Sequence, residues 1–390
     1  MLVVTIVHDP EDARIRRRQI GALLDAGAQV SYAAPYRAYG RSGRDGVQAL
    51  DLPRAVGRRR LAAIRAARRL IRAEGPAHDL VLMHDPELVL AVIGLPARRP
   101  EPRGPVGRVG RAGGTGGTGG NGGNGPVLVW DVHEDTAAAL GLKSWLPAAA
   151  RPVVSWAVRR LERWAENHLR LLLAETSYQA RFARPHPVVP NTVPVPAQDP
   201  PPPGDARVVY VGRITRARGG LDMVEVGRLL AGSVLVDLIG TVDGDLAEPI
   251  AEAERQGWVR GHGFVPNEAA LQLLDGALAG LSLLHDEPNY ADSRPTKVME
   301  YMAHGIPVVT TPNASSVDLV ERYGCGLVVP FGDPAAAAAA VRTLQQDGEQ
   351  RHRLAAAGRA ASVGALDWGR SGEEFVSLLS SWTGRAGAGW

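Results

Sequence analysis

The sequence has almost no cysteine and few aromatic residues. One of its 390 residues is a cysteine, Cys325, so no intrachain disulfide can form and a reducing compartment fits. Only 5% of the residues are aromatic while 45% are hydrophobic, so the core must rely on Leu, Val, Ile and Ala. Cys325 has no charged neighbour in its Gly-flanked stretch, which favours a buried, inert thiol. A disulfide-stapled fold is excluded.

Long apolar runs and metal-binding patterns are absent as well. No run approaches the roughly 20 apolar residues that a membrane span needs. The apolar start 2–7 is interrupted by His8 and Asp9, too early for the core of a signal peptide. The ten histidines show no metal-ligand spacing with the single cysteine. We therefore expect a cytoplasmic protein that binds no metal and no cofactor.

The small net charge of +3 conceals a strong asymmetry. Residues 1–190 hold 28 Lys and Arg against 17 Asp and Glu, a net +11, which leaves 16 and 24 for the rest, a net −8. The first half therefore suits an acidic partner. Residues 58–72 are predicted to form an arginine-rich helix, with Leu61, Ile64 and Ile71 on its other face. The arginine face fits either a peripheral contact with a membrane or an ordinary solvent-exposed helix surface. Nucleic acid is not expected, because no aromatic residues interleave the arginines.

Short apolar runs alternate with amphipathic stretches along nearly the whole chain. This alternation predicts parallel α/β sheets covered on both faces. In the first half we expect helices at 14–26 and 153–168. Strands are expected at 2–7, 29–32, 80–84, 127–132 and 171–174, and then at 208–211, 234–239, 259–261, 279–284, 307–309 and 326–329.

A proline-rich stretch separates two such patterns. We predict a Rossmann-like first domain over 1–193, a stiff linker over 194–205 and a Rossmann-like second domain over 206–366. A crossing helix and tail would follow at 367–390. Residues 97–125 are rich in Gly and Arg and are predicted to form a disordered insertion in the first domain.

The strongest motif runs from Asp292 to Val309. A helix is expected to open at Pro295, where free N–H groups and the helix dipole favour an anion. Thr296 would add a hydroxyl and Lys297 a charge, and Glu300 would follow one turn later on the same side.

A second motif follows the strand at 208–211. Gly212 would allow close backbone approach, and Arg213 and Arg218 flank a tight strand-to-helix loop. Arginines at the carboxyl end of a Rossmann strand are suited to phosphate. The alternative is a solvated basic loop.

The combination resembles family 4 retaining glycosyltransferases, which have the GT-B fold of two Rossmann-like domains facing across a cleft. The residues that carry the resemblance are Gly212–Gly219, with Arg218 in place of the usual lysine, and Asp292 to Glu300, with Asp in place of the first Glu. Weaker matches are Val188–Asn191, Gly261–Asn267 and Asp12–Ile15. The resemblance covers nearly the whole chain except 97–125.

The resemblance implies a role for each matching residue. Arg213 and Arg218 would hold the diphosphate of a nucleotide sugar, with Gly212 and the N–H groups of Thr296, Lys297 and Val298 beside it. Glu300 would bind the ribose, and the backbone at Val265 would meet the base. His133 and Asp292 are the catalytic candidates near the sugar.

Acceptor-side positions are less closely matched. The family's Gly-Gly loop after the first strand is replaced here by 8–14, which should face the acceptor. Candidates on that side are Asp9, Glu11, Arg14, His84 and Glu134. At the end of the strand at 80–84, Asp85 alternatively caps the next helix. Asp243 and Asp245 spell a D-x-D pattern, which we interpret as a turn.

The sequence therefore predicts metal-independent transfer of a sugar from a nucleoside diphosphate, UDP foremost, with retention of configuration. The acceptor is unknown; an acidic molecule, a membrane-associated one and a small secondary metabolite all fit. Two alternatives stay open: another GT-B enzyme on the same site, such as an epimerase or a pseudo-glycosyltransferase, and a non-catalytic sugar-nucleotide binding protein.

Overall fold

The computed structural model describes residues 1–43, 46–98, 125–133, 151–287 and 296–384. These residues form two units, of which the first combines Met1–Pro190 with the chain from Arg370 onward and the second is Asn191–Gly369. Most of the 97–125 insertion lies outside the described residues. None of the described helices is long and apolar enough to cross a membrane.

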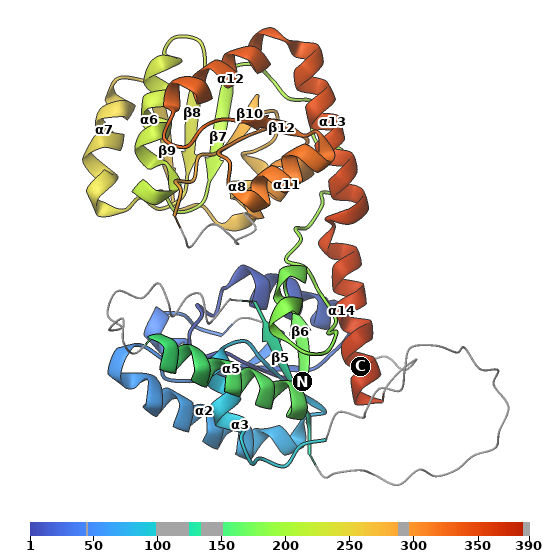
Figure 1. The fold of residues 1–390 in the computed structure, drawn as a ribbon. Coiled ribbons are helices and arrows are strands. Elements are labelled where there is room, and N and C mark those ends of the chain that lie inside the picture. The colour runs from blue at the N-terminus through green and yellow to red at the C-terminus, as the bar shows by residue number, and fades with distance from the viewer. Residues whose placement is uncertain (44–45, 99–124, 134–150, 288–295, 385–390) are drawn as a thin grey trace, which may run out of the picture. The chain divides into compact units, whose positions relative to one another are not determined.

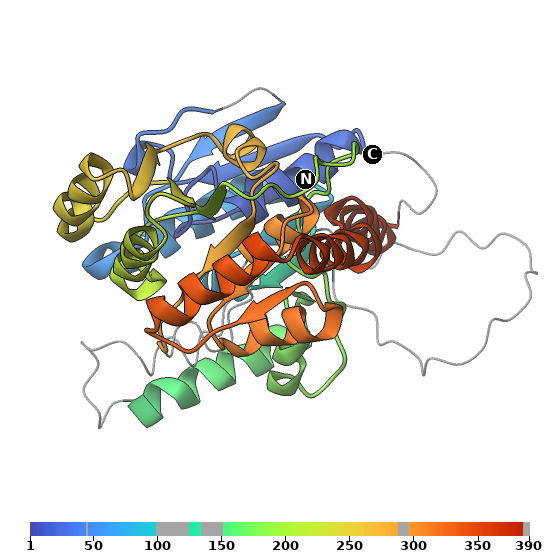
Figure 2. The same ribbon diagram turned by 90° about the horizontal axis from the view of Figure 1, so that it is seen from above.

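The first unit contains a six-stranded parallel sheet in the order β3-β2-β1-β4-β5-β6, drawn from blue to green in Figures 1 and 2. The strands are β1 (Leu2–Val4), β2 (Val30–Ala34), β3 (Val47–Asp51), β4 (Leu80–Met83), β5 (Val127–Val132) and β6 (Arg170–Leu173). Its longer helices are α2 (Arg60–Glu74), α3 (Pro86–Val92) and α5 (Arg151–His168). Short segments are η1 (Ala13–Ile20), α1 (Gly21–Asp25), η2 (Arg37–Tyr39), η3 (Gly57–Arg59), η4 (Gly75–Ala77) and η6 (Thr176–Arg181).

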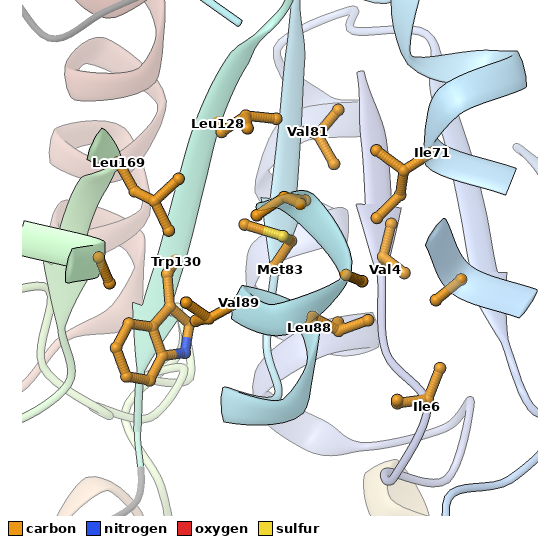
Figure 3. Packing of buried hydrophobic residues seen from close by; sticks show 14 of the residues in the cluster. Val4, Ile6, Ile71, Val81, Met83, Leu88, Val89, Leu128, Trp130 and Leu169 are labelled. Atoms are coloured by element: carbon orange, nitrogen blue, oxygen red, sulfur yellow. The ribbon is translucent and has the colours of Figure 1, made fainter. Parts of the chain in front are cut away.

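The core of this unit lies between the sheet and its helices. Figure 3 shows Trp130 of β5 packed beside Met83 of β4, with Val89 of α3 against them. The inner strands β1, β2, β4 and β5 carry mostly apolar runs, because both faces of a covered parallel sheet are buried there.

Three details of this unit differ from the sequence predictions. Strand β3 was not predicted, because it lies at the sheet edge and most of its residues are exposed, so it lacks an apolar run. The helix expected at 14–26 begins as the π-helix η1 and continues as α1. Leu61 lies on the exposed face of α2, with 64% of its surface accessible, and not on the buried face.

The second unit repeats the design with the strand order β12-β11-β10-β7-β8-β9, all parallel. Its strands are β7 (Arg207–Val211), β8 (Leu235–Ile239), β9 (Val259–Gly263), β10 (Ala279–Ser282), β11 (Val308–Thr310) and β12 (Gly326–Val328). Its helical segments are η7 (Arg216–Arg218), α6 (Gly220–Leu229), η8 (Gly244–Leu246), α7 (Ala247–Arg255), α8 (Asn267–Gln272), α10 (Thr296–Ala303), α11 (Ala314–Tyr323), α12 (Pro334–Gln346) and α13 (Gly348–Ala365).

The last helix, α14 (Trp368–Thr383), begins at the end of the second unit and continues into the first. Within the first unit, Arg98 Nη1 donates to the carbonyl oxygen of Thr383 at 3.4 Å, and the Arg170 guanidinium lies over the Trp382 ring. The predicted return of the C-terminal helix to the first unit is therefore confirmed.

Candidate functional site

A cluster of cationic residues lies at the carboxyl end of β7 in the second unit. A Cβ built on Gly212 would lie 3.9 Å from Arg218 Nη1, 3.9 Å from Lys297 Nζ and 3.7 Å from the Tyr210 hydroxyl. Arg218 comes from η7 and Lys297 from the first turn of α10. The fold thus brings the two sequence motifs together around Gly212, whose φ of 125° few other residues adopt.

The Tyr210 hydroxyl connects the members of this cluster. It donates to the carbonyl oxygen of Arg213 at 2.8 Å and accepts from Lys297 Nζ at 2.9 Å. Arg218 also donates to it. Burial raises the pKa of Tyr210 to about 12, against the opposing effect of Arg218, so the hydroxyl stays protonated and keeps its donor role. One buried phenol therefore positions three residues of the predicted diphosphate site.

The Lys297 ammonium has an unusual environment. It lies 4.1 Å from the centroid of the Tyr210 ring, a cation–π contact. Burial and the charge of Arg218 lower its pKa to about 7, and Glu300 only partly opposes them. A cation held beside a second cation favours an arriving anion, because the anion relieves their repulsion.

Tight packing fixes the helix that carries Lys297. Gly280 of β10 leaves room for the Tyr301 ring, since a Cβ there would lie 2.3 Å from ring atoms. The Tyr301 hydroxyl accepts from Val211 N at 3.2 Å and donates to the carbonyl oxygen of Leu281 at 3.0 Å. These bonds tie α10 to β7 and β10. The arginine loop is fixed in the same manner, because a Cβ on Gly219 would lie 2.2 Å from the carbonyl oxygen of Leu283.

The D-x-D pattern lies next to this loop and pairs with its arginines. Arg213 Nε donates to Asp243 Oδ1 at 2.7 Å, and Arg216 Nε donates to Asp245 Oδ2 at 2.6 Å. Arg213 is exposed, so its pair with Asp243 costs little to rearrange when a ligand arrives.

The other residues predicted to bind the nucleotide-sugar donor lie at several places in the second unit. Thr296 opens α10 and is half-buried, as is Glu300. Val298 is fully buried, so only its backbone can meet a ligand. Val265 is half-buried in the loop after β9. Asp292 lies outside the described residues.

A second polar cluster occupies the carboxyl ends of β4 and β5 in the first unit. Asp131 is fully buried and receives Arg14 Nη2 at 2.7 Å, Arg14 Nε at 2.8 Å and Gln19 Nε2 at 3.0 Å. Burial alone would raise the pKa of Asp131, but Arg14, with His133 and His84, holds it well below its usual range. This carboxylate is therefore ionised at neutral pH.

The acceptor-side candidates Arg14 and His84 belong to this buried network. Arg14 is 5% exposed and His84 is 1% exposed, so neither presents its side chain to an acceptor as the sequence predicted. Burial lowers the pKa of His84 to about 4, so its ring is neutral at physiological pH. Both residues are better described as supports for Asp131.

His133 lies at the rim of the same network. Its Nδ1 is 3.2 Å from the Asp131 carbonyl oxygen and 3.6 Å from Asp131 Oδ2, while its Nε2 is 3.0 Å from His8 Nε2. Asp85 does not cap α3. It accepts instead from Thr5 Oγ1 and Ile6 N, and its Oδ1 lies 3.4 Å from His8 Nε2.

The remaining first-unit candidates lie in or near the loop after β1. Asp9 is half-buried, accepts from Glu11 N at 2.9 Å and pairs with Arg41. Glu11 is half-buried in the same loop. Glu134 lies outside the described residues.

Among the described residues, His84, Asp131 and His133 bring possible metal ligands within 4.8 Å of one another. A cation there would meet the guanidinium of Arg14, which already donates to both oxygens of Asp131. Coulomb repulsion therefore argues against a metal at this place.

Tyr210 is expected to matter for ligand binding although it was not among the predicted site residues. In the sequence, Tyr210 lies within an apolar strand, and such a residue is expected to pack in the hydrophobic core. Replacement by phenylalanine should leave the carbonyl of Arg213 and the ammonium of Lys297 without a buried partner, which costs about 1–3 kcal/mol. We expect Tyr210→Phe to weaken UDP binding about tenfold, measured by calorimetry. Unchanged UDP affinity would contradict the positioning role, and Tyr323→Phe serves as a control outside this cluster.

Part of the second unit matches a known protein family. Residues 195–361 match the model of the family "Glycosyl transferases group 1". The amylovoran biosynthesis glycosyltransferase AmsK of Erwinia amylovora is 30% identical over 146 residues, which is 36% of this chain and 36% of AmsK.

Solved structures resemble nearly the whole chain. Sucrose-phosphate synthase from Thermosynechococcus elongatus has a TM-score of 0.67 at 16% identity and covers 98% of both chains. HepE from Anabaena in complex with UDP-glucose has a TM-score of 0.65 at 13% identity, over 97% of this chain and 99% of HepE. The chain has the GT-B fold. The family model matches residues 195–361 of the second unit, and the solved structures share the fold of the whole chain.

Proposed function

We propose that this chain is a metal-independent, retaining glycosyltransferase of family 4 that transfers a sugar from a nucleoside diphosphate, UDP foremost, to an acceptor hydroxyl or amine. The observation that carries the proposal is the convergence of Arg218, Lys297 and the start of α10 around Gly212. Two cationic side chains and a helix N-terminus at one strand end form a site suited to a diphosphate. The structural similarity to HepE, which was solved with UDP-glucose, supports UDP.

In this proposal, the protein acts mainly on the leaving group. As the bond from the anomeric carbon to the diphosphate breaks, its electron pair moves to the phosphate oxygen. Arg218, Lys297 and Arg213 would stabilise that charge, and Glu300 would hold the ribose. Asp243 and Asp245 pair with Arg213 and Arg216, which supports a reaction without a metal held by that pattern.

The acceptor is proposed to reach the enzyme in the cytoplasm. The exposed face of η3 and α2 carries arginines next to Leu61, and this face fits an anionic surface such as the inner side of a membrane. The arginines are Arg58, Arg59, Arg65, Arg69 and Arg72.

Product analysis tests the activity directly. The full chain is incubated in EDTA with UDP-sugars of known α configuration, and the products are followed by proton NMR. We expect release of UDP and α-configured products. A β-configured product would refute retention, formation of an epimeric UDP-sugar without acceptor would favour an epimerase, and tight donor binding without turnover would favour a binding protein.

The lowered pKa of Lys297 makes a prediction about pH. Diphosphate favours the charged ammonium, so its binding is expected to raise the pKa of Lys297 above about 7. The contribution of Lys297 to affinity is then complete below pH 7 and declines as the pH rises above 7, by up to about tenfold per unit. Calorimetric titration with UDP between pH 7 and 9.5 measures this slope. Lys297→Arg keeps its charge and should give a flatter profile; equal slopes would contradict the prediction.

A further inference from the structure

The three longer helices of the first unit form one layer on its sheet (Figure 1). Residues of α2, α3 and α5 pack on the same hydrophobic core, and α3 contacts both α2 and α5. Arg68 of α2 donates to the carbonyl oxygens of Ala91 at 2.8 Å and Ile93 at 2.7 Å, which ties α2 to the end of α3. The outer side of these helices and of η3 is therefore one continuous surface, which we call the helix-layer surface.

The charges of these helices are sorted by sign. The arginines of η3 and α2 named above are exposed, and α5 adds the exposed Arg159, Arg160 and Arg163.

The acidic side chains of the same helices are turned inward. Those of Glu87, Glu162 and Glu166 are 17%, 5% and 5% exposed, and each pairs with an arginine. Glu74 is half-buried. No exposed acidic side chain on α2, α3 or α5 therefore offsets the arginines, and the helix-layer surface attracts anions.

Large apolar side chains lie among these arginines. Nine large hydrophobic residues are exposed in the described part of the chain, and six of them lie in the helix-layer surface or directly beside it. These six are Val56, Leu61, Leu90, Ile93, Val153 and Trp156. Trp156 is 59% exposed, and the Arg160 guanidinium lies 5.4 Å from the centroid of its ring. A group of exposed apolar residues of this kind is typical of an interaction surface.

The mixture of charged and apolar side chains decides between possible partners. A soluble polyanion would pair with the arginines but would leave the apolar side chains in water. A bilayer that contains anionic lipids accommodates both, because arginines bind lipid phosphate while Trp and Leu side chains enter the boundary between headgroups and acyl chains.

We propose that the helix-layer surface docks on an anionic lipid bilayer, with Trp156 and Leu61 inserted between the headgroups. This docking extends the contact proposed for α2 to α3 and α5, and it adds insertion of apolar side chains to attraction by charge. It rests on the proposed function only in its consequence, which is that a docked enzyme meets an acceptor anchored in the membrane.

Binding of the full chain to vesicles tests the docking without donor or acceptor. We expect at least about tenfold tighter binding to phosphatidylcholine vesicles that contain phosphatidylglycerol than to pure phosphatidylcholine vesicles. Trp156→Ser should weaken this binding at least about fivefold. The double variant Arg159→Gln, Arg163→Gln should weaken it at least about tenfold, whereas lysine at both positions should keep most of it.

Two exposed residues on α13 of the second unit provide matched controls. Val363→Ser removes an exposed apolar side chain and Arg353→Gln an exposed charge, and both should leave vesicle binding unchanged. Insertion has its own readout, because brominated acyl chains quench tryptophan fluorescence on contact. The quenching seen with the wild-type chain should be largely lost in Trp156→Phe.

Each alternative predicts a different result. Equal binding to both kinds of vesicle, or equal losses in the control variants, would overturn the docking. Unchanged vesicle binding in Trp156→Ser, together with tight binding of heparin, would overturn it in favour of a soluble polyanion. None of these results bears on the glycosyltransferase function, which fails only if the product analysis detects no transfer.

Discussion

Replacement of Arg218 by alanine is expected to lower kcat for donor turnover about 100- to 1,000-fold. Arg218 lies with Lys297 and Tyr210 around Gly212, where the leaving diphosphate is proposed to develop its charge. Loss of one preorganised donor of this kind costs roughly 2.7–4 kcal/mol of transition-state stabilisation. The rate of sugar release from a UDP-sugar, measured with saturating donor, gives the effect.

The chain supplies a matched control two residues away. Arg216 lies in the same short helical segment, is exposed and pairs with Asp245. We expect Arg216→Ala to reduce kcat less than about threefold. Similar losses in both variants, or a normal rate in Arg218→Ala, would contradict this account. The reaction would then not depend on a specific contact between Arg218 and the diphosphate.

The second large effect is expected on stability. Asp131→Ala would leave the guanidinium of Arg14 buried without its counter-charge. Breaking a buried pair from one side costs about 3–5 kcal/mol. We expect a loss of that size in the free energy of unfolding of the first unit, measured by urea titration with separate probes for the two units.

An exposed pair provides the comparison. Asp318→Ala breaks the ion pair with Arg322, in which both side chains are about half exposed, and should cost less than about 1 kcal/mol. The double variant Arg14→Met, Asp131→Leu should recover much of the lost stability, because it removes both charges. A loss below about 1 kcal/mol in Asp131→Ala would contradict the account of this network.

Much of the architecture could be predicted from hydrophobic patterning. The strand at 127–132 is confirmed to the residue, because a buried central strand is an uninterrupted apolar run. Strand β3 was missed because an edge strand lacks that run. The arginine and Lys297 motifs could be recognised because each lies within a few residues of a strand end or a helix start.

Contacts between distant parts of the chain could not be predicted in this way. Arg14 and Asp131 are 117 positions apart, and nothing local to either residue indicates the other. Arg14 therefore looked like a surface residue facing a ligand. Tyr210 looked like core for a similar reason, since its hydroxyl gains its role only from Lys297, 87 positions later.

Calorimetric titration of the full chain with UDP and, separately, with uridine tests the central claim most directly. GDP with guanosine and ADP with adenosine complete the comparison for other bases. If the cluster of Tyr210, Arg218 and Lys297 around Gly212 binds a diphosphate, at least one nucleoside diphosphate will bind at least about 100-fold more tightly than its nucleoside. Equal affinities within every pair, or no binding of any diphosphate, would contradict the account.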